Sequence, residues 1–335
     1  MESGGWASDL LRELAAPLDS RDAGLASEIV FGCLRYQAQL DYLIGRHTGS
    51  RTLDREVRIA LRMGIYQIRY LDRVPPHAAV GESVELVKRA GKRSAAGLVN
   101  AVLRKVDRAP VAWPDRATEF SCPAWLLDRW DHHYGPPVAQ RIAAAALQPP
   151  EVNVASTGRI QDIGSQSIVP LLDIQPGMSF LDLCAAPGNK TAQAIEMGAH
   201  AVACDLHWHR LNDSGLACPR VVLDGTQPLP FSRRFDRILV DAPCSGTGTL
   251  GRNPEIKWHL RPSDLANLHG RQVALLRSAL AAVEPGGKLV YSTCSLEEEE
   301  NEQVIAAFPG DWSIHRRIPG VDPGDGFFAA VLPSN

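Results

Sequence analysis

Apolar positions along the first third of the chain recur with the period of a helix. Over residues 1–108 they fall mostly three or four residues apart, which is typical of amphipathic helices that bury one face. Residues 58–71 and 79–106 keep this period along their length. Asp19-Ser20 and Pro75-Pro76 interrupt it, as helix-capping and helix-breaking residues do. We expect an all-α domain over residues 1–108.

Prolines interrupt the segment from residue 109 to residue 160. Those that define it are Pro110, Pro114, Pro123, Pro136, Pro137, Pro149 and Pro150. Short helices are expected from Pro123 to His133 and from Pro137 to Leu147, where the apolar spacing returns to that of a helix. The segment holds more Trp and Leu than a free linker would. We therefore interpret 109–160 as a connector that packs against its neighbours.

From residue 161 onward short apolar runs alternate with helical stretches. The runs are FLDL, AVACD, RVVLD, ILVDA and KLVYST, and helices are expected over 190–197 and 263–283. Buried strands that alternate with helices are typical of a parallel, doubly wound sheet, here with the expected order 3-2-1-4-5. WSIHRRI and GFFAAVL near the end predict an antiparallel hairpin at the sheet edge. Residues 161–335 therefore predict an α/β domain.

Composition supports a two-domain globular protein. The 335 residues are 45% hydrophobic and 22% charged, which is ordinary for globular domains. No run approaches the ~20 apolar residues of a membrane span, and the opening MESGGWASDLLREL does not resemble a signal peptide. The seven cysteines form no CxxC pair, so we expect neither a disulfide framework nor a metal site, and a cytoplasmic location. We also expect a monomer.

Charge is distributed unevenly between the two halves. The net charge is −3, but residues 1–110 carry 17 Lys/Arg against 13 Asp/Glu, while 111–335 carry 18 against 25. A basic front half is compatible with phosphate contacts concentrated there. Solvated helix faces explain the same pattern, and charge alone favours that simpler interpretation.

The turn after the first predicted strand has the features of a cofactor loop. It reads Cys184, Ala185, Ala186, Pro187, Gly188, Asn189 and Lys190, and small residues there let backbone N–H groups approach a ligand. Asp205 ends the second strand, where a carboxylate can bind ribose hydroxyls, and Asp224 ends the third, near the expected adenine. The loop lacks G-x-G-x-x-G, so it favours S-adenosylmethionine over a dinucleotide.

Two cysteines follow the next two predicted strands. Asp241-Ala-Pro-Cys244 ends the fourth strand and Ser292-Thr-Cys294 ends the fifth, and neighbouring strands lie about 4.8 Å apart. Buried Cys is more often a small apolar residue, but polar, turn-forming residues surround both thiols. A thiolate added to carbon 6 of cytosine makes carbon 5 nucleophilic toward a methyl donor. Asp241 is placed to hydrogen-bond the ring.

Several motifs together resemble one family. FLDLCAAPGNKT, ILVDAPCSGTGTLGRNPEIKW, LVYSTCSLEEEENE and DGFF are similar to the successive motifs of the RNA 5-methylcytosine methyltransferases of the NOL1/NOP2/Sun group. The stretch RVPPHAAVGESVELVKRAGKRSAAGLVNAVLRKV resembles the NusB-like RNA-binding domain that precedes the catalytic domain in the bacterial enzymes of this group that act on the small ribosomal subunit. The resemblance spans most of the chain.

The resemblance implies a fold and an activity. The fold is α/β, with a Rossmann-like class I S-adenosylmethionine methyltransferase domain over 161–335 preceded by an all-α NusB-like domain. The activity is methyl transfer to carbon 5 of a cytosine in RNA, with ribosomal RNA or an assembling small subunit as partner. Cys294 is implied as the nucleophile and Cys244 as the cysteine that releases product. Cofactor contacts are implied from 184–190 and from Asp205, Asp224 and Asp241.

The chain departs from the family pattern in two places. Asn189 stands where relatives usually have a second glycine; Asn tolerates a positive backbone φ better than most residues. Val152-Asn153-Val154 is followed almost at once by Arg159, where relatives hold several tens of residues that form a substrate-facing subdomain. We therefore interpret 109–160 as the connector plus a shortened form of that segment.

Other polar residues have two interpretations each. Arg252, Lys257 and Trp258 follow the PCSGTG loop and either contact RNA, as cationic and aromatic groups do, or form a packed helix start. Five basic residues of the front half either contact RNA phosphates or are solvated: Arg89, Lys92, Arg93, Arg104 and Lys105. The run Glu297–Glu300 is interpreted as the first turn of a helix, where acidic residues suit the dipole.

Three alternative functions remain open on the sequence. A DNA cytosine methyltransferase would use Cys244, not Cys294, as nucleophile. A non-catalytic RNA-binding protein on a decayed methyltransferase fold is the second, and a small-molecule methyltransferase is the third. The paired thiols and the helical front domain favour the RNA enzyme over all three.

Overall fold

The computed structural model describes residues 6–49, 51–155, 157–212 and 215–333. It divides the chain into two compact units. Unit 1 comprises residues 1–148 together with 250–258, and unit 2 comprises 149–249 together with 259–335. The opening segment that does not resemble a signal peptide begins with residues 1–5, which lie outside the described residues. The sequence-based boundaries at 108 and 160 stay predictions.

Unit 1 is all-α in its described residues. Its helices are α1 (Ala7–Leu14), α2 (Ser20–Arg35), α3 (Gln37–Thr48), α4 (Arg55–Tyr70), α5 (Pro76–Arg89), the 3₁₀ helix η1 (Arg93–Ala95), α6 (Ala96–Leu103), α7 (Arg116–Glu119), α8 (Ala124–Tyr134), α9 (Pro136–Ala145) and α13 (Ile256–His259). Asp19 caps α2 by accepting the backbone N–H groups of Arg21 and Asp22, as a residue at this position should. The predicted helices of 1–108 are confirmed.

The core of unit 1 is built from the apolar stripes of α3 to α6. Leu61 and Ile65 of α4 are fully buried and pack with Leu40, Val87 and Val99 of its neighbours. These positions are the periodic apolar residues of the sequence, which explains why the helix prediction holds. The expected period over 79–106 is broken once, because Gly91 has a φ of 77° and ends α5.

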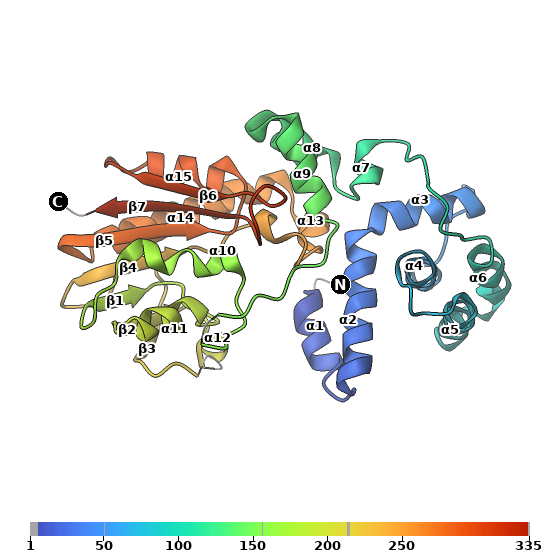
Figure 1. Ribbon diagram of the computed structural model, residues 1–335, viewed down its shortest axis with the longest axis horizontal. Coiled ribbons are helices and arrows are strands. Elements are labelled where there is room, and N and C mark those ends of the chain that lie inside the picture. Colours follow the sequence, from blue (N-terminus) through green and yellow to red (C-terminus); the bar gives the residue numbers. More distant parts are fainter. Residues whose placement is uncertain (1–5, 50, 156, 213–214, 334–335) are drawn as a thin grey trace. The chain divides into compact units, whose positions relative to one another are not determined.

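Unit 2 contains a seven-stranded sheet of order β3-β2-β1-β4-β5-β7-β6, and Figure 1 shows the strands side by side in this order. The strands are β1 (Ser179–Asp182), β2 (His200–Asp205), β3 (Arg220–Val222), β4 (Phe235–Asp241), β5 (Val283–Thr293), β6 (Ser313–Arg317) and β7 (Phe327–Pro333). The first five are parallel, while β6 and β7 form an antiparallel hairpin against β5. Both the order 3-2-1-4-5 and the edge hairpin are confirmed.

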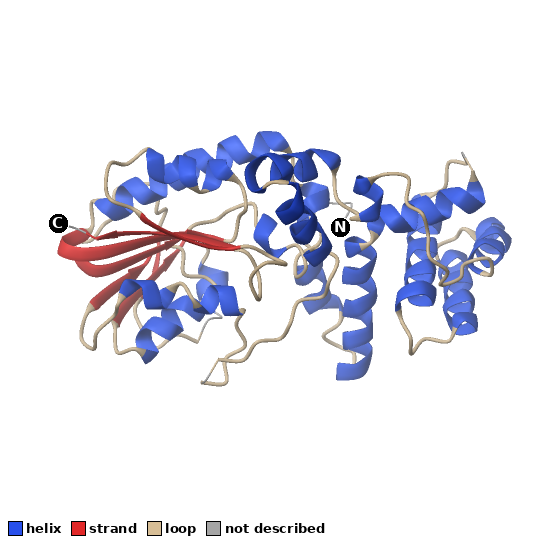
Figure 2. Cartoon of the chain, turned by 45° about the horizontal axis from the view of Figure 1, so that its top comes forward, coloured by secondary structure: helices blue, strands red, loops and turns tan. Residues whose placement is uncertain are grey.

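Helices cover both faces of this sheet (Figure 2). They are α10 (Ile163–Gln166), η2 (Val169–Leu172), α11 (Asn189–Glu196), α12 (Trp208–Asn212), η3 (Thr247–Thr249), α14 (Pro262–Leu280), η4 (Glu298–Glu300) and α15 (Glu302–Ala306). Neighbouring strand residues alternate between the two cores: Leu289 and Tyr291 face α14, and Val290 faces the core with η2. This period of two explains why the strands are nearly continuous apolar runs.

Candidate active site

The two cysteine thiols meet at the carboxyl edge of the sheet. Cys244 follows β4 and Cys294 follows β5, and these strands pair in parallel with Asp241 opposite Ser292. The Sγ atoms lie 3.4 Å apart, and both side chains are partly exposed. The expectation that strand order brings the two thiols to one rim is confirmed.

Backbone contacts join the two cysteine loops directly. The N–H of Gly248 donates to the carbonyl of Cys294 over 2.9 Å, and the N–H of Gly326 donates to the carbonyl of Gly248 over 2.7 Å. A Cβ on Gly248 would lie 2.8 Å from the Cys294 carbonyl oxygen and 2.6 Å from that of Gly326. Only glycine permits this approach, so the PCSGTG motif is a packing requirement of the thiol pair.

A buried carboxylate joins the two loops that carry the thiols. Glu300 is fully buried in η4, and it accepts hydrogen bonds from the N–H of Ser245 (2.8 Å) and the Nε2 of Gln272 (3.0 Å). The hydroxyls of Ser245 and Ser295 donate to its other oxygen. The expectation that this acidic run stands in the first turn of a helix is confirmed for Glu298–Glu300, while the burial and the hydrogen bonds of Glu300 are not predicted by the sequence.

The environment of Cys244 disfavours its thiolate form. The hydrogen bond to Cys294 and burial both raise the pKa of Cys244 well above its ordinary value, and the charges of Cys294 and Glu300 raise it further. These surroundings favour the thiol form of Cys244.

The 184–190 loop runs from β1 into α11. Gly188 has a φ of 106°, a conformation that favours glycine, and Asn189 is already the first residue of the helix. The expectation that Asn189 must tolerate a positive φ is wrong, because Gly188 provides it. The backbone N–H of Ala186 donates to Oδ2 of Asp205 over 3.1 Å, which ties the loop to the end of β2.

An ion pair joins this loop to the strand that leads to Cys244. Nζ of Lys190 lies 2.6 Å from Oδ2 of Asp241, and Oδ1 of Asp241 accepts the Ser292 hydroxyl over 2.8 Å. Burial by itself would lower the pKa of Lys190, but the charge and hydrogen bond of Asp241 outweigh it and the pKa is raised. Lys190 is thus held as a cation beside Asp241.

Asp182, at the end of β1, is buried, and only one of its two carboxyl oxygens has a hydrogen-bond partner among the described residues. Its Oδ2 accepts the Thr191 hydroxyl over 2.6 Å, while its Oδ1 has no hydrogen-bond partner among the described residues. Burial raises its pKa to about 7, with the nearby charge of Asp241 adding to the effect against the Thr191 hydrogen bond. An unpaired buried oxygen of this kind is costly unless a ligand completes it.

The remaining loop and carboxylate residues lie in different settings. Burial raises the pKa of the Cys184 thiol well above its ordinary value, and Asp205 is buried. Asp224 is exposed, and its Oδ1 accepts the N–H and hydroxyl of Thr226. These hydrogen bonds lower the pKa of Asp224. The structure brings 184–190, Asp205 and Asp241 together, while Asp224 bonds within its own turn.

Of the residues interpreted two ways after the PCSGTG loop, Lys257 and Trp258 are packed inside unit 1. Nζ of Lys257 donates to the carbonyl of Arg35 over 2.9 Å, and Nε1 of Trp258 donates to that of Leu34 over 2.8 Å. Lys257 is fully buried, and burial lowers its pKa to about 8. The phosphate-contact interpretation of Lys257 is wrong.

Four of the five basic residues of the front half are exposed, and the fifth, Lys92, is half-buried. Arg89, Arg93, Arg104 and Lys105 are exposed, and Lys92 forms an ion pair with Asp54 over 2.8 Å. Their contact with RNA stays a prediction.

The segment from 152 to 161 is a tight turn. Val154 pairs with Ile160 in an isolated antiparallel bridge, and the N–H of Ala155 donates to the carbonyl of Arg159 over 2.8 Å. Arg159 forms an ion pair with Glu196 of α11. The place where the resemblance predicts a subdomain is therefore closed by one turn fixed to the catalytic unit.

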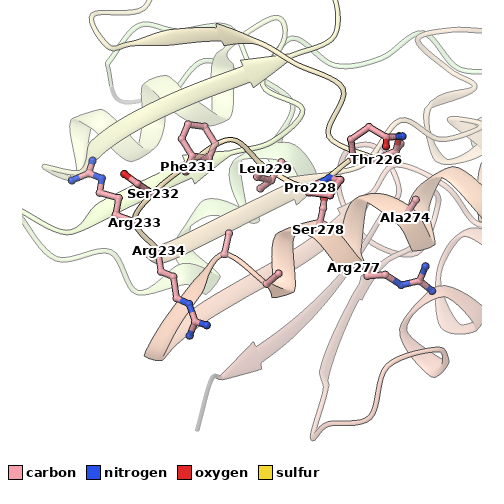
Figure 3. Close-up of a pocket in the computed structure, with 13 residues that line it drawn as sticks. Thr226, Pro228, Leu229, Phe231, Ser232, Arg233, Arg234, Ala274, Arg277 and Ser278 are labelled. Atoms are coloured by element: carbon pink, nitrogen blue, oxygen red, sulfur yellow. The ribbon is translucent and has the colours of Figure 1, made fainter.

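A cavity of about 460 Å³ lies away from the thiols, between the β3–β4 connection and the last turns of α14. It is bounded by Leu229, Phe231 and three arginines, Arg233, Arg234 and Arg277. Figure 3 shows the three arginines pointing in different directions. They do not converge on one anion, so the cavity adds nothing to the chemistry of the site.

Known proteins match the whole of this architecture. A family model described as "16S rRNA methyltransferase RsmB/F" matches residues 169–313, and a "NusB family" model matches 2–108. A ribosomal RNA small subunit methyltransferase B of Klebsiella pneumoniae is 32% identical over an alignment that covers 99% of this chain and 95% of the relative. The chain belongs to this family. The family resemblance drawn from the motifs is confirmed.

Solved structures agree with the fold. The structure of PH0851 aligns with a TM-score of 0.75 at 21% identity, over 95% of this chain and 91% of that one. A methyltransferase homolog protein from Pyrococcus horikoshii aligns with a TM-score of 0.55 at 25% identity, over 67% of this chain and all of its own. The chain therefore has a NusB domain and a Rossmann-like methyltransferase domain, as predicted.

The alignment with the Klebsiella relative is 412 positions long, longer than the 335 residues of this chain. The relative therefore holds segments that this chain lacks.

Within the described residues, no helix is long and apolar enough to cross a membrane.

Proposed function

We propose that this family member transfers a methyl group from S-adenosylmethionine to carbon 5 of a cytosine in small-subunit ribosomal RNA, through a covalent bond between Cys294 and the base. The observation that carries the proposal is the 3.4 Å separation of the Cys244 and Cys294 sulfur atoms at the carboxyl edge of the sheet. Two adjacent, partly exposed thiols suit a reaction in which one thiol attacks the base and the other assists its release.

The residues of the β1 and β2 ends fit the proposed cofactor. Asp182 keeps one buried oxygen without a partner among the described residues, and this oxygen suits the amino group of the cofactor. The oxygens of Asp205 accept one N–H each, from Ala186 and His207, so lone pairs remain for ribose hydroxyls. Loop 184–190 lines the same edge, and Asp224 is assigned the adenine side.

In the proposed reaction, Cys294, Asp241 and Cys244 each have a separate role. Bound S-adenosylmethionine supplies a methyl group on a positively charged sulfur. Cys294 adds as a thiolate to carbon 6 of the cytosine, which makes carbon 5 nucleophilic toward that methyl group. Asp241, oriented by Lys190 and Ser292, hydrogen-bonds the polar edge of the ring. Cys244 assists the loss of the carbon 5 proton and the expulsion of Cys294.

The helical unit is assigned the task of gripping RNA. Arg89, Arg93, Arg104 and Lys105 are exposed there, and such side chains bind phosphates through charge. A paired target base must also be flipped out at a cost of a few kcal/mol, which contacts to neighbouring RNA would offset. No disulfide joins any of the seven cysteines, each of which lies among the described residues, and this fits the proposed bacterial cytoplasm.

Product analysis tests the proposal. Purified protein is incubated with S-adenosylmethionine and either unmethylated 16S ribosomal RNA or small subunits, and the nucleosides are separated by mass spectrometry. The expected product is 5-methylcytidine with the wild type and none with Cys294→Ala. A methylated base other than cytosine, a methylated ribose, or full activity of Cys294→Ala would contradict the proposal.

A further inference from the structure

Both cysteines of the thiol pair are followed by serine, and both serines bind one carboxylate. Ser245 donates its N–H and its hydroxyl to Glu300, and Ser295 donates its hydroxyl to the same side chain. The two serine hydroxyls also lie 3.1 Å from each other. Each thiol is thus one residue away from a hydrogen bond to Glu300.

The hydrogen-bonding groups around Glu300 require an acceptor. The backbone N–H of Ser245 and the amide of Gln272 are donors in any protonation state, and both point to Oε1. An ionised carboxylate has only acceptor sites, and charge-assisted hydrogen bonds of this kind are stronger than neutral ones. With all four donors in place, burial of the charge is offset by its hydrogen bonds.

Glu300 is itself fixed to the sheet from two sides. The hydroxyl of Tyr291 in β5 donates to the backbone carbonyl of Glu300 over 2.6 Å, and Nδ2 of Asn301 donates to the carbonyl of Ser295 over 2.9 Å. Gln272 of α14 donates to Glu300 and to the carbonyl of Pro243, each over 3.0 Å. Contacts from β5 and α14 therefore fix the position of the carboxylate. The carboxylate in turn holds both cysteine loops through its hydrogen bonds to Ser245 and Ser295.

We propose that Glu300 is the positioning residue that sets the distance between the two thiols, acting through Ser245 and Ser295. Glu300 touches neither sulfur in any contact described above, so beyond the effect of its charge on the pKa of Cys244 it acts on the thiols through geometry. Because a misplacement of about 1 Å at a reacting group costs up to about a hundredfold in rate, loss of the carboxylate should lower kcat. The proposal rests on the proposed function for its kinetic consequence, but the distance between the thiols is independent of it.

The test uses the full chain with Glu300→Gln, which keeps the size of the side chain, and Glu298→Gln as control. The control removes one negative charge from the same 3₁₀ helix, from a half-buried position. Two quantities are measured: steady-state methylation of 16S ribosomal RNA, and the rate at which phenylarsine oxide bridges Cys244 to Cys294, located by peptide mass spectrometry. The arsenical bridges only adjacent thiols, with loss of water.

Glu300→Gln is expected to lower kcat by about tenfold or more, with KM for RNA and for S-adenosylmethionine within about twofold. It is also expected to slow bridging of the two cysteines, while Glu298→Gln leaves both quantities at wild-type values. Wild-type kcat and bridging in Glu300→Gln would overturn the proposal, and so would a lower kcat with unchanged bridging.

A second variant keeps the test independent of folding. If Glu300→Gln does not fold, the double variant Ser245→Ala/Ser295→Ala removes both hydroxyl donors and keeps the carboxylate, to which the N–H of Ser245 and the amide of Gln272 still donate. It is expected to show the same two losses, and wild-type bridging in it would overturn the proposal. A wild-type protein that is bridged normally but makes no 5-methylcytidine contradicts the proposed function and leaves the role of Glu300 tested by bridging alone.

Discussion

Lys190 and Asp241 form an ion pair of 2.6 Å that connects the loop after β1 to the end of β4. Cys244 follows three residues after Asp241, and Ser292, which also bonds Asp241, precedes Cys294 by two. The loop proposed to hold the cofactor and the loops that carry the thiols are therefore linked through one carboxylate. A change at Asp241 should disturb both at once.

The first prediction concerns the close approach at Gly248. In Gly248→Ala the new methyl group would lie 2.8 Å from the carbonyl oxygen of Cys294, so the backbone of one loop must move. We expect kcat for methylation of 16S ribosomal RNA to fall by about tenfold or more. Gly270→Ala is the matched control, because this exposed glycine of α14 has open space around its Cβ position. It should stabilise the chain by roughly 0.5–1 kcal/mol, and similar activities of the two variants would contradict the prediction.

The second prediction concerns the unpaired oxygen of Asp182. If Oδ1 binds the cofactor, Asp182→Asn should weaken S-adenosylmethionine binding by about ten- to a hundredfold, as expected for a lost hydrogen bond worth about 1.5–3 kcal/mol. Since its pKa is raised to about 7, wild-type affinity should increase from pH 6 to pH 8 as the carboxyl ionises. Calorimetric titration measures both effects. Asp311→Asn, an exposed position, is the control, and equal affinities of the two variants would count against this cofactor site.

The third prediction follows from the buried ammonium of Lys257. Its pKa falls from 10.5 to about 8 in the folded chain, so between these pH values the unfolded state binds more protons and stability rises with pH. The penalty is fully present below pH 8. Compared with Lys257→Met, the wild type should gain about 3 kcal/mol in free energy of unfolding between pH 8 and pH 10.5. Urea denaturation at pH 7, 8.5 and 10 measures this difference, and parallel curves for the two proteins would refute it.

The sequence predicted those parts of the site that depend on strand order. Cys244 and Cys294 each follow an apolar run, and the pairing of β4 with β5 follows from the doubly wound topology alone. The same reasoning located loop 184–190 and Asp205 at one edge. Such predictions need only local sequence patterns and the sheet topology, and few topologies are compatible with strands and helices that alternate along the chain.

Glu300 could not be predicted in the same way. Four consecutive glutamates look alike in the sequence, and which of them is buried depends on the phase of the 3₁₀ helix η4 and on Gln272, 28 residues earlier. One signal in the sequence points to it: each of the two cysteines is followed by a serine, Ser245 or Ser295, and a buried hydroxyl needs an acceptor. For Lys257, the sequence left an RNA contact and a packed helix start open, and the structure satisfies its ammonium with a backbone carbonyl.

Trapping the enzyme on RNA tests the proposed role of Cys294 most directly. Cys244→Ala and Cys294→Ala are each incubated with 16S ribosomal RNA and S-adenosylmethionine, and covalent protein–RNA complexes are separated under denaturing conditions. We predict that Cys244→Ala accumulates a complex through Cys294, because the base is attacked but not released, and that Cys294→Ala forms none. A complex formed only by Cys294→Ala, or by neither variant while the wild type makes 5-methylcytidine, would contradict the assignment of Cys294 as nucleophile.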